Sequence, residues 1–419
     1  MASPRQALAP LVGAVLLALP APPAAGQATP DVALGRSLAN VMRSAGGGSG
    51  AFVYNATDRA RVLALRHRTA RVLASNTKLF TSAAALAQVG SGATLPTDVR
   101  GVGALEPDGT WRGDLYLRGG GDPTFGSSRF VRRAYGAGAT VEALALELKA
   151  GGVKRVSGRI LGDETRFDRL RGTGYSGFRA SLDVGGPLSA LAYNRGLASE
   201  SGRYFQVNPP AFAASKLRAA LTARGISVAG SPTAGRTPAG ARILASVESP
   251  PMGRIVRIMN KPSDNYFAET LVKDVGVLAA ARGTTAVGAR ASAAFARRLG
   301  AAARLVDGSG LSRRDQASPY RVARLLLALR ERGDFDAFFN SLPIAGRDGT
   351  LATRMRGGAA RGRCRAKTGT LLSVSALSGY CTARSGDVYV FSILMNRVSV
   401  TGARRVQDRM ANAIAAVRG

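Results

Sequence analysis

The order of strand-like, helix-like and glycine-rich segments is the feature that most constrains the fold of this chain. Near the N-terminus, residues 51–54 and 62–65 have the pattern of paired strands, and a strongly apolar helix is expected at 75–89. Near the C-terminus, residues 388–395 form an almost uninterrupted apolar run typical of a buried strand. From about 95 to 243, glycine-rich turns alternate with short strand-like runs. This pattern predicts one domain built from both ends of the chain, with a second domain inserted into it.

We therefore expect four segments. Residues 1–28 form a leader, 29–96 the first part of the outer domain, 97–241 the inserted domain, and 242–419 the second part of the outer domain. Strands near both ends with helices between them favour an α+β class for the outer domain. The inserted domain is expected to be rich in β structure.

The leader has the layout of a secretory signal peptide. Arg5 precedes an apolar run at 7–19, Pro20 ends that run, and small residues follow around a plausible cleavage site. The run is too short to span a bilayer comfortably, and the rest of the sequence has no apolar stretch of about 18 residues or more. We therefore expect an exported protein, periplasmic or extracellular, with no transmembrane segment.

Export makes the two cysteines candidates for a disulfide. Cys364 and Cys381 are equally far from the midpoint between Leu372 and Ser373, and both flanks read as strands. A hairpin that turns at this midpoint would place the two cysteines opposite each other, within disulfide reach. The alternative is a pair of independently buried thiols.

Composition limits the chemistry. The single His and two Cys leave almost no ligands for a zinc site, so metal catalysis would need carboxylates alone. The 58 basic residues against 26 acidic ones give a net charge of +32, which should attract anionic wall polymers weakly at low salt. A compositional bias explains the excess of arginine more simply than selection for a polyanion-binding surface does. We therefore expect no specific nucleic-acid partner.

One lysine has a serine at helical spacing before it. Only Lys78, among seven lysines, follows a serine by three residues, in Ser75-Asn76-Thr77-Lys78. The hydroxyl and the amine would lie on one helix face, and a buried, uncharged amine could deprotonate the serine. The apolar helix that follows would keep this site dry. Taken alone, the pattern also fits an ordinary helix start with a surface lysine.

Two further motifs follow in order along the chain. Ser263-Asp264-Asn265 opens a helical run, and Lys367-Thr368-Gly369-Thr370 lies in the strand expected before Leu372. Each is unremarkable alone, as a helix cap or a strand end. Together with Ser75 and Lys78, they match the set known for penicillin-binding serine acyltransferases and β-lactamases.

More of the sequence resembles one branch of that superfamily, the D-alanyl-D-alanine carboxypeptidase/endopeptidases of the low-molecular-mass penicillin-binding proteins. The resemblance covers nearly the whole mature chain, and its middle blocks separate this branch from β-lactamases, which lack the insertion. It implies a penicillin-binding/serine β-lactamase-like catalytic domain, an antiparallel sheet flanked by helices, with an inserted β-rich domain. The blocks that carry it lie at 74–80, 113–124 (GDLYLRGGGDPT), 158–168 (GRILGDETRFD), 186–194 (GPLSALAYN), 249–270, 307–313 (DGSGLSR) and 341–371.

The resemblance also implies residue roles. Ser75 would be the nucleophile acylated by the penultimate D-alanine carbonyl, and Lys78 the general base. Ser263 would relay the proton to the leaving amine, and Asn265 would orient Lys78 and the substrate amide.

The third motif would bind the substrate. Lys367 would hold the terminal carboxylate as a cation, assisted by the hydroxyls of Thr368 and Thr370 in the Lys-Thr-Gly-Thr motif that includes Gly369. Its charge would also favour a neutral amine on Lys78. The backbone N–H groups of Ser75 and Thr370 would form the oxyanion hole. The mechanism that the resemblance implies needs neither a metal nor a cofactor.

The sequence departs from the family in places. Many members carry a third small domain after the block at 186–194, but here 14 positions separate Asn194 from Asn208, so we expect it to be absent. The stretch 174–181 contains Arg179 and no acid, which argues against a preference for stem peptides with a free diaminopimelate ammonium. Leu73 replaces the usual proline. The resemblance implies that Arg313 contacts the side chain of the substrate. The residues DGSGLS before it, taken alone, indicate only a tight turn.

The predicted function is trimming of peptidoglycan stem peptides by a serine D-alanyl-D-alanine carboxypeptidase, with cleavage of crosslinks by the same site left open. β-Lactams should act as covalent inhibitors. A β-lactamase or esterase of the same superfamily and a non-catalytic, basic wall-polymer-binding protein are the alternatives. A Ser-His-Asp mechanism is disfavoured because the only histidine, His67, lies in a basic strand and reads as structural.

Overall fold

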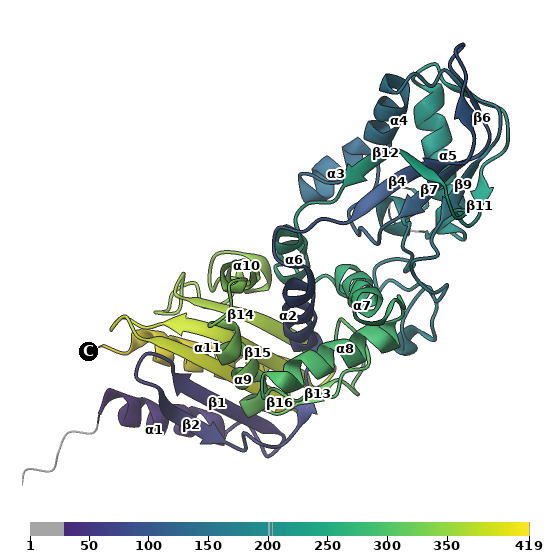
Figure 1. Ribbon diagram of the computed structural model, residues 1–419. Helices are drawn as coiled ribbons and strands as arrows, with labels where there is room; N and C mark the ends of the chain where they lie inside the picture. The colour runs from purple at the N-terminus through teal and green to yellow at the C-terminus, as the bar shows by residue number, and fades with distance from the viewer. Residues whose placement is uncertain (1–28, 200–201, 203, 419) are drawn as a thin grey trace, which may run out of the picture.

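The computed structural model describes residues 29–199, 202 and 204–418. The predicted signal peptide at 1–28 lies outside the described residues. The chain forms two bodies along a long axis (Figure 1). The two ends of the chain, purple and yellow in the figure, share one body, and the teal middle of the chain forms the other.

The first body is built on a five-stranded sheet in the order β14-β15-β16-β1-β2, and every pairing is antiparallel. Helices cover both faces, so alternate side chains of β16 enter two different cores: Phe391 and Ile393 on one face, Val390 and Leu394 on the other. The strands are β1 (Ser49–Asn55), β2 (Ala60–Leu65), β14 (Cys364–Leu371), β15 (Val374–Thr382) and β16 (Val388–Asn396).

Two groups of helices cover this sheet. The terminal helices α1 (Pro30–Arg43) and α11 (Val400–Ala416) pack together on one face. The other face carries the core around α2, which is buried along most of its length as its apolar composition predicts. The helices of that second group are α2 (Thr77–Val89), α6 (Met252–Asn260), α7 (Asn265–Ala280), α8 (Thr285–Arg298), α9 (Pro319–Leu329) and α10 (Phe335–Ser341).

Among the residues that the structure describes, the second body contains two small sheets and three α-helices. One sheet has the order β11-β9-β7-β4-β12 and the other β10-β8-β6-β5, with parallel as well as antiparallel pairs. Its elements are β4 (Pro96–Gly101), β5 (Ala104–Leu105), β6 (Thr110–Arg112), β7 (Leu115–Gly119), α3 (Ser128–Tyr135), α4 (Val141–Ala150), β8 (Arg155–Val156), β9 (Ile160–Asp163), α5 (Pro209–Thr222), β10 (Ser227–Val228), β11 (Thr233–Ala234) and β12 (Arg242–Glu248). A two-stranded sheet in the first body joins β3 (Arg71–Val72) to β13 (Gln316–Ala317).

The α+β class and the sheet of the outer domain are confirmed. The expected strands at 51–54, 62–65 and 388–395 correspond to β1, β2 and β16. The division of the chain into domains stays a prediction. Strand β12, which pairs with β4 of the second body, begins at the predicted boundary between residues 241 and 242.

The hairpin near the C-terminus forms in the predicted register. β14 and β15 are joined through Leu372 and Ser373, and Cys364 lies directly opposite Cys381. The two cysteines form a disulfide. Ser373, the second residue of this two-residue turn, has a φ of 59°.

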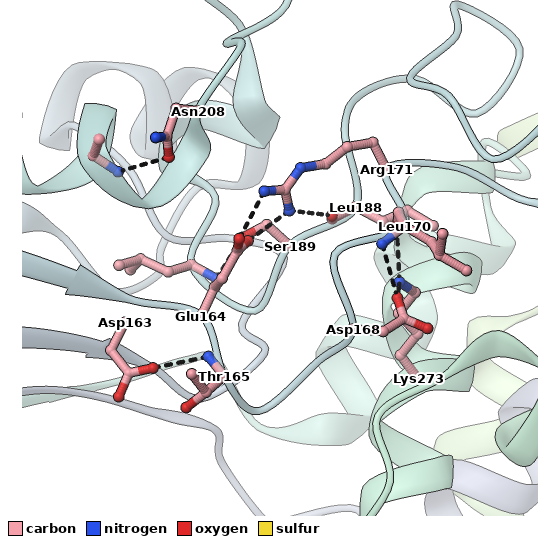
Figure 2. Close-up of polar contacts among 12 residues, drawn as sticks. Asp163, Glu164, Thr165, Asp168, Leu170, Arg171, Leu188, Ser189, Asn208 and Lys273 are labelled. Atoms are coloured by element: carbon pink, nitrogen blue, oxygen red, sulfur yellow. Dashed lines mark hydrogen bonds and ion pairs between the residues drawn. The ribbon is translucent and has the colours of Figure 1, made fainter. Parts of the chain in front are cut away.

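Ion pairs connect the segment after β9 to helix α7 (Figure 2). The Nζ of Lys273, which is completely buried, donates to Asp168 at 2.6 Å and to the carbonyl of Leu170 at 3.0 Å. In the same segment, Arg171 and Glu164 form a two-pronged pair at 2.5 and 2.6 Å. Since α7 begins at Asn265 of the second motif, the contacts of Lys273 tie the helix that carries this motif to the segment after β9.

Candidate active site

The first motif starts at a tight turn between β3 and α2. Ser75 lies in a short 3-10 helix, Ala74–Asn76, which leads directly into α2. Ala74 has a φ of 47°, and two glycines of other segments pack against the turn. A Cβ on Gly369 would lie 3.1 Å from the backbone nitrogen of Ser75, and one on Gly310 would lie 1.9 Å from the carbonyl oxygen of Ala74. The two glycines therefore let β14 and the loop before β13 approach the serine.

Lys78 is completely buried one helical turn after Ser75. Its Nζ lies 3.1 Å from Ser75 Oγ, 2.6 Å from Asn265 Oδ1 and 2.8 Å from the carbonyl oxygen of Ser309. The structure thus joins the first and second motifs through one amine. The shared helix face expected from the spacing is present.

Burial changes the acidity of this amine. It lowers the pKa of Lys78 to about 8, because the charged form loses its hydration. Nearby carboxylates oppose the change, with Glu269 contributing most and Asp307 next. The balance leaves an amine that is partly uncharged near neutral pH.

The second motif forms the start of α7. Asp264 caps the helix by accepting from the backbone N–H of Phe267, and a two-pronged pair with Arg195 at 2.5 and 3.2 Å holds its carboxylate. Asn265 follows at the first helical position, and its amide also donates to the carbonyl of Asp183 at 2.7 Å. Ser263 precedes the cap with a φ of 66°.

The third motif lies on β14, at the edge of the sheet. The Nζ of Lys367 donates to Ser263 Oγ at 2.8 Å and to the carbonyl of Thr368 at 2.9 Å. Lys367 is completely buried, and burial together with the charge of Lys78 holds its pKa well below the ordinary lysine value. The three motifs therefore converge, as the sequence predicts.

A groove of about 390 Å³ opens over this convergence. Thr368, on its floor, shares a hydrogen bond of 2.7 Å with Thr350, and Thr370 accepts from Arg404 at 3.2 Å. The lining residues are Ser75, Ser263, Thr350, Thr353, Arg354, Thr368, Thr370 and Arg404.

Arg313 lies in a different cavity, of about 670 Å³. Its guanidinium donates to the carbonyl of Leu372, at the turn after β14. Tyr175 and Phe178, both about half exposed, form part of the wall, and Leu371 is shared with the strand that lines the groove. The cavity lies beside the end of β14, and the substrate contact expected of Arg313 stays a prediction.

Sequence reasoning missed the carboxylates behind Lys78. Glu269 accepts from the backbone N–H groups of Gly308 and Ser309, and Asp307 accepts from those of Gly310 and Ser312. Burial and the charge of Asp307 raise the pKa of Glu269. Asp307, the first residue of DGSGLSR, is a local sequence signal for a turn. Nothing near Glu269 in the sequence indicated that its carboxylate would accept from the backbone of that turn.

Sequence reasoning also missed Thr350, Arg354 and Arg404 of the groove. The arginines could not be singled out among 58 basic residues, because their positions depend on how α11 packs against β14. His67, in contrast, lies in a turn after β2 and not in the expected strand; it is half-buried, and its ring stacks on Phe52.

Within residues 29–199, 202 and 204–418, no three His, Cys, Asp or Glu side chains form a group suited to a metal ion. In the same part of the chain, every helix is too short or too polar for a membrane span.

Comparisons with known proteins agree with this geometry. Residues 37–200 and 181–417 match the D-Ala-D-Ala carboxypeptidase 3 (S13) family. A D-alanyl-D-alanine carboxypeptidase of Actinomadura sp. (strain R39) is 30% identical over an alignment 427 positions long, which covers 83% of this chain and 77% of that protein.

Solved structures share the fold. Penicillin binding protein 4 (dacB) from Haemophilus influenzae superposes with a TM-score of 0.73 at 21% identity, over 90% of this chain and 99% of that one. A penicillin G-acylated predatory endopeptidase from Bdellovibrio bacteriovorus, in complex with an immunity protein, gives a TM-score of 0.52 at 19% identity, over 87% of this chain and 90% of that one.

Proposed function

Because this chain belongs to the D-Ala-D-Ala carboxypeptidase 3 (S13) family of serine-type carboxypeptidases, we propose that Ser75 is the nucleophile acylated by a peptidoglycan stem peptide. The observation that carries the proposal is the buried amine of Lys78, 3.1 Å from Ser75 Oγ. Within the described part of the chain, Lys78 is the only basic side chain that forms a hydrogen bond with Ser75 Oγ.

The hydrogen bonds around Lys78 suit a neutral amine. A neutral amine has two N–H donors and one lone pair. The carbonyl oxygens of Asn265 and Ser309 can take both donors, since each can only accept. The lone pair then faces the hydroxyl of Ser75, which supports proton abstraction by Lys78.

The reaction then proceeds by acyl transfer. Ser75 Oγ attacks the carbonyl of the penultimate D-alanine while its proton passes to Lys78. The proton returns through Ser263 to the nitrogen of the leaving D-alanine, and the C–N bond breaks. Water repeats the sequence on the ester, which releases the shortened peptide and restores the serine. Lys367, bonded to Ser263, lies where it can support this relay.

Two backbone N–H groups are available for the developing oxyanion. Ser75 stands at the start of α2, where free donors are concentrated, and Thr370 is its counterpart on β14. A Cβ at position 369 would lie 2.8 Å from the carbonyl oxygen of Leu73 and 3.1 Å from the backbone nitrogen of Ser75, so a side chain there would crowd the turn that carries the serine. Gly369 thus lets the backbone N–H groups of Ser75 and Thr370 approach the carbonyl oxygen of the scissile bond together.

The wider setting fits wall metabolism. The pattern of residues 1–28 and the disulfide between Cys364 and Cys381 both support export to an oxidising compartment, where peptidoglycan is the substrate. β-Lactams mimic the D-alanyl-D-alanine end, and the acylated Bdellovibrio structure supports the same reaction here. We therefore propose that β-lactams acylate Ser75 and that water hydrolyses the resulting ester slowly.

Two assays on purified protein test the proposal. Fluorescent penicillin should label the protein covalently, and a peptide ending in D-alanyl-D-alanine should release D-alanine. Ser75→Ala should abolish both signals, whereas Ser215→Ala, which changes an exposed serine of α5, should leave them unchanged. Labelling that survives Ser75→Ala would refute the assignment, and rapid turnover of penicillin would favour a β-lactamase instead.

A further inference from the structure

We propose that Glu269 is a positioning residue for the reaction, because its carboxyl group holds the loop whose carbonyl oxygen fixes the amine of Lys78 beside Ser75. The proposal rests on the acyl-transfer function proposed for Ser75. It adds to the three motifs a side chain of α7 that does not line the groove.

One face of helix α7 controls both carbonyl acceptors of Lys78. Asn265, at the first position of the helix, accepts from the Nζ of Lys78 at 2.6 Å. Glu269 follows four residues later, and residues at this spacing lie on the same helix face. Its carboxyl group accepts from the backbone N–H of Ser309 at 2.8 Å, and the carbonyl oxygen of Ser309 is the second acceptor of Lys78, at 2.8 Å. The helix therefore makes one contact directly and supports the loop that makes the other.

The loop is bound to α7 through its backbone donors. Glu269 also accepts from the backbone N–H of Gly308, at 3.1 and 3.2 Å, so one carboxyl group takes two consecutive donors. Gly308 lies so close to α7 that a Cβ there would be 2.4 Å from the carbonyl oxygen of Ala268. Glu269 and both donor residues are buried. Without this acceptor, two buried N–H groups would be unsatisfied, and the loop would have to move to pair them.

Such a movement would reach the nucleophile through the amine. Lys78 can accept the proton of Ser75 only while its lone pair faces the hydroxyl, and the two carbonyl acceptors keep it there by taking both N–H donors. If the carbonyl of Ser309 turned away, one donor would be free and the amine could rotate. A misplacement of about 1 Å in a catalytic group can cost about a hundredfold in rate.

Charge is a second link between Glu269 and Lys78. Burial lowers the pKa of Lys78, and among the nearby charges Glu269 opposes this effect most. Replacement of the acid by its amide should therefore lower the pKa of Lys78 further, whereas entry of water into the site should raise it. The other charged groups that face Glu269 or Lys78 are Asp264 and Lys273 at the two ends of the first turns of α7, Asp307 and Asp315 in the loop before β13, and Lys367 on β14.

Three variants test the inference through the time course of Ser75 labelling by fluorescent penicillin at a series of pH values. The amplitude measures how much protein is folded, and the rate constant measures the site. Glu269→Leu, which keeps the size of the side chain and removes the acceptor, should lower the rate constant above the midpoint by about 10–100-fold. Glu269→Gln keeps an oxygen for the N–H of Ser309, so it should retain most of this rate constant and shift the midpoint to lower pH.

Thr270→Val is the matched control. Thr270 is the next residue of α7 and is also buried, and its hydroxyl has no hydrogen-bond partner among the described residues. The variant should match the wild type in both rate constant and midpoint.

The outcomes separate positioning from structural support. A smaller amplitude with a wild-type rate constant in Glu269→Leu would show that Glu269 only stabilises the fold. An equal loss of rate in Glu269→Gln and Glu269→Leu would show that the retained oxygen does not hold the loop, and a midpoint of Glu269→Gln above that of the wild type would show that water enters the site. Each of these results overturns the inference. If Glu269→Leu does not fold, the rate constant and midpoint of Glu269→Gln decide alone. Failure of the acyl-transfer function would look different, since the wild-type protein would then take no label on Ser75 at any pH.

Discussion

At the scale of single residues, the site depends on backbone atoms brought unusually close together. Gly310 has a φ of 84°, and its α-carbon faces the carbonyl of Ala74, directly before the nucleophile. A side chain there would meet both that oxygen and the hydroxyl of Thr77, 2.8 Å from the ideal Cβ. The loop thus positions Ser75 by contact as well as supplying the carbonyl of Ser309 to Lys78.

Gly310→Ala should therefore slow acylation of Ser75 by more than the backbone strain of an alanine with positive φ would by itself. A left-handed alanine costs about 1–2 kcal/mol wherever it stands. Gly225→Ala is the matched control, because Gly225 has a φ of 81° and nothing within 4 Å of an added Cβ. We expect Gly310→Ala to slow acylation by penicillin at least about tenfold relative to Gly225→Ala. Equal rates in the two variants would contradict the contact.

At the scale of elements, the hairpin β14–β15 presents the third motif on an edge strand. The disulfide between Cys364 and Cys381 closes the open end of this hairpin, opposite the turn at Leu372. A crosslink over 17 residues restricts the unfolded chain, which stabilises the fold by about 3 kcal/mol in the chain-entropy model.

Removal of both thiols should reveal this contribution. The double variant Cys364→Ala, Cys381→Ala should lose about 2–3 kcal/mol of unfolding free energy in denaturant titrations without reductant. Reductant should destabilise the wild type and leave the double variant unchanged. Two titratable thiols in denatured, unreduced wild-type protein would contradict the bridge.

Much at this scale was predictable from sequence. The hairpin followed from symmetric flanks around Leu372 and Ser373, and α2 followed from its continuous apolar run. Local patterns encode such elements because strand and helix periodicity is a short-range property. The bond between Asn265 and Lys78 spans 187 residues, and only the resemblance to a known family predicted it.

At the scale of the whole molecule, buried carboxylates lie where the two bodies meet. Asp122 follows β7 of the second body, and Asp274 lies on α7 against Gly121. Burial raises the pKa of each carboxyl to about 7. No pattern in the sequence pointed to this contact, because it depends on how the bodies pack. The place of Arg404 in the groove could not be predicted from the sequence either, because its neighbours come from β14 and from the loop around Thr350.

These raised pKa values predict a stability that falls as pH rises. The folded protein holds the proton of Asp122 up to about pH 7, while the unfolded chain releases it near pH 4, so stability is lost across that window. Asp122→Asn keeps the acceptor for Thr124 and removes the charge.

The variant should therefore be more stable than the wild type by about 2–4 kcal/mol above pH 7, and nearly equal to it below pH 4. Thermal unfolding at both pH values provides the measurement. Glu331→Gln, which removes an exposed acid, is the control and should change little at either pH. A variant that is less stable than wild type above pH 7 would rule out the assigned protonation.

The pH dependence of acylation tests the central claim most directly, because that claim is a buried, neutral Lys78 acting on Ser75. The second-order rate constant for benzylpenicillin should rise with pH as the amine loses its proton and level off above about pH 8. A profile without pH dependence in this range, or one whose midpoint lies near the ordinary lysine pKa of about 10.4, would contradict the account.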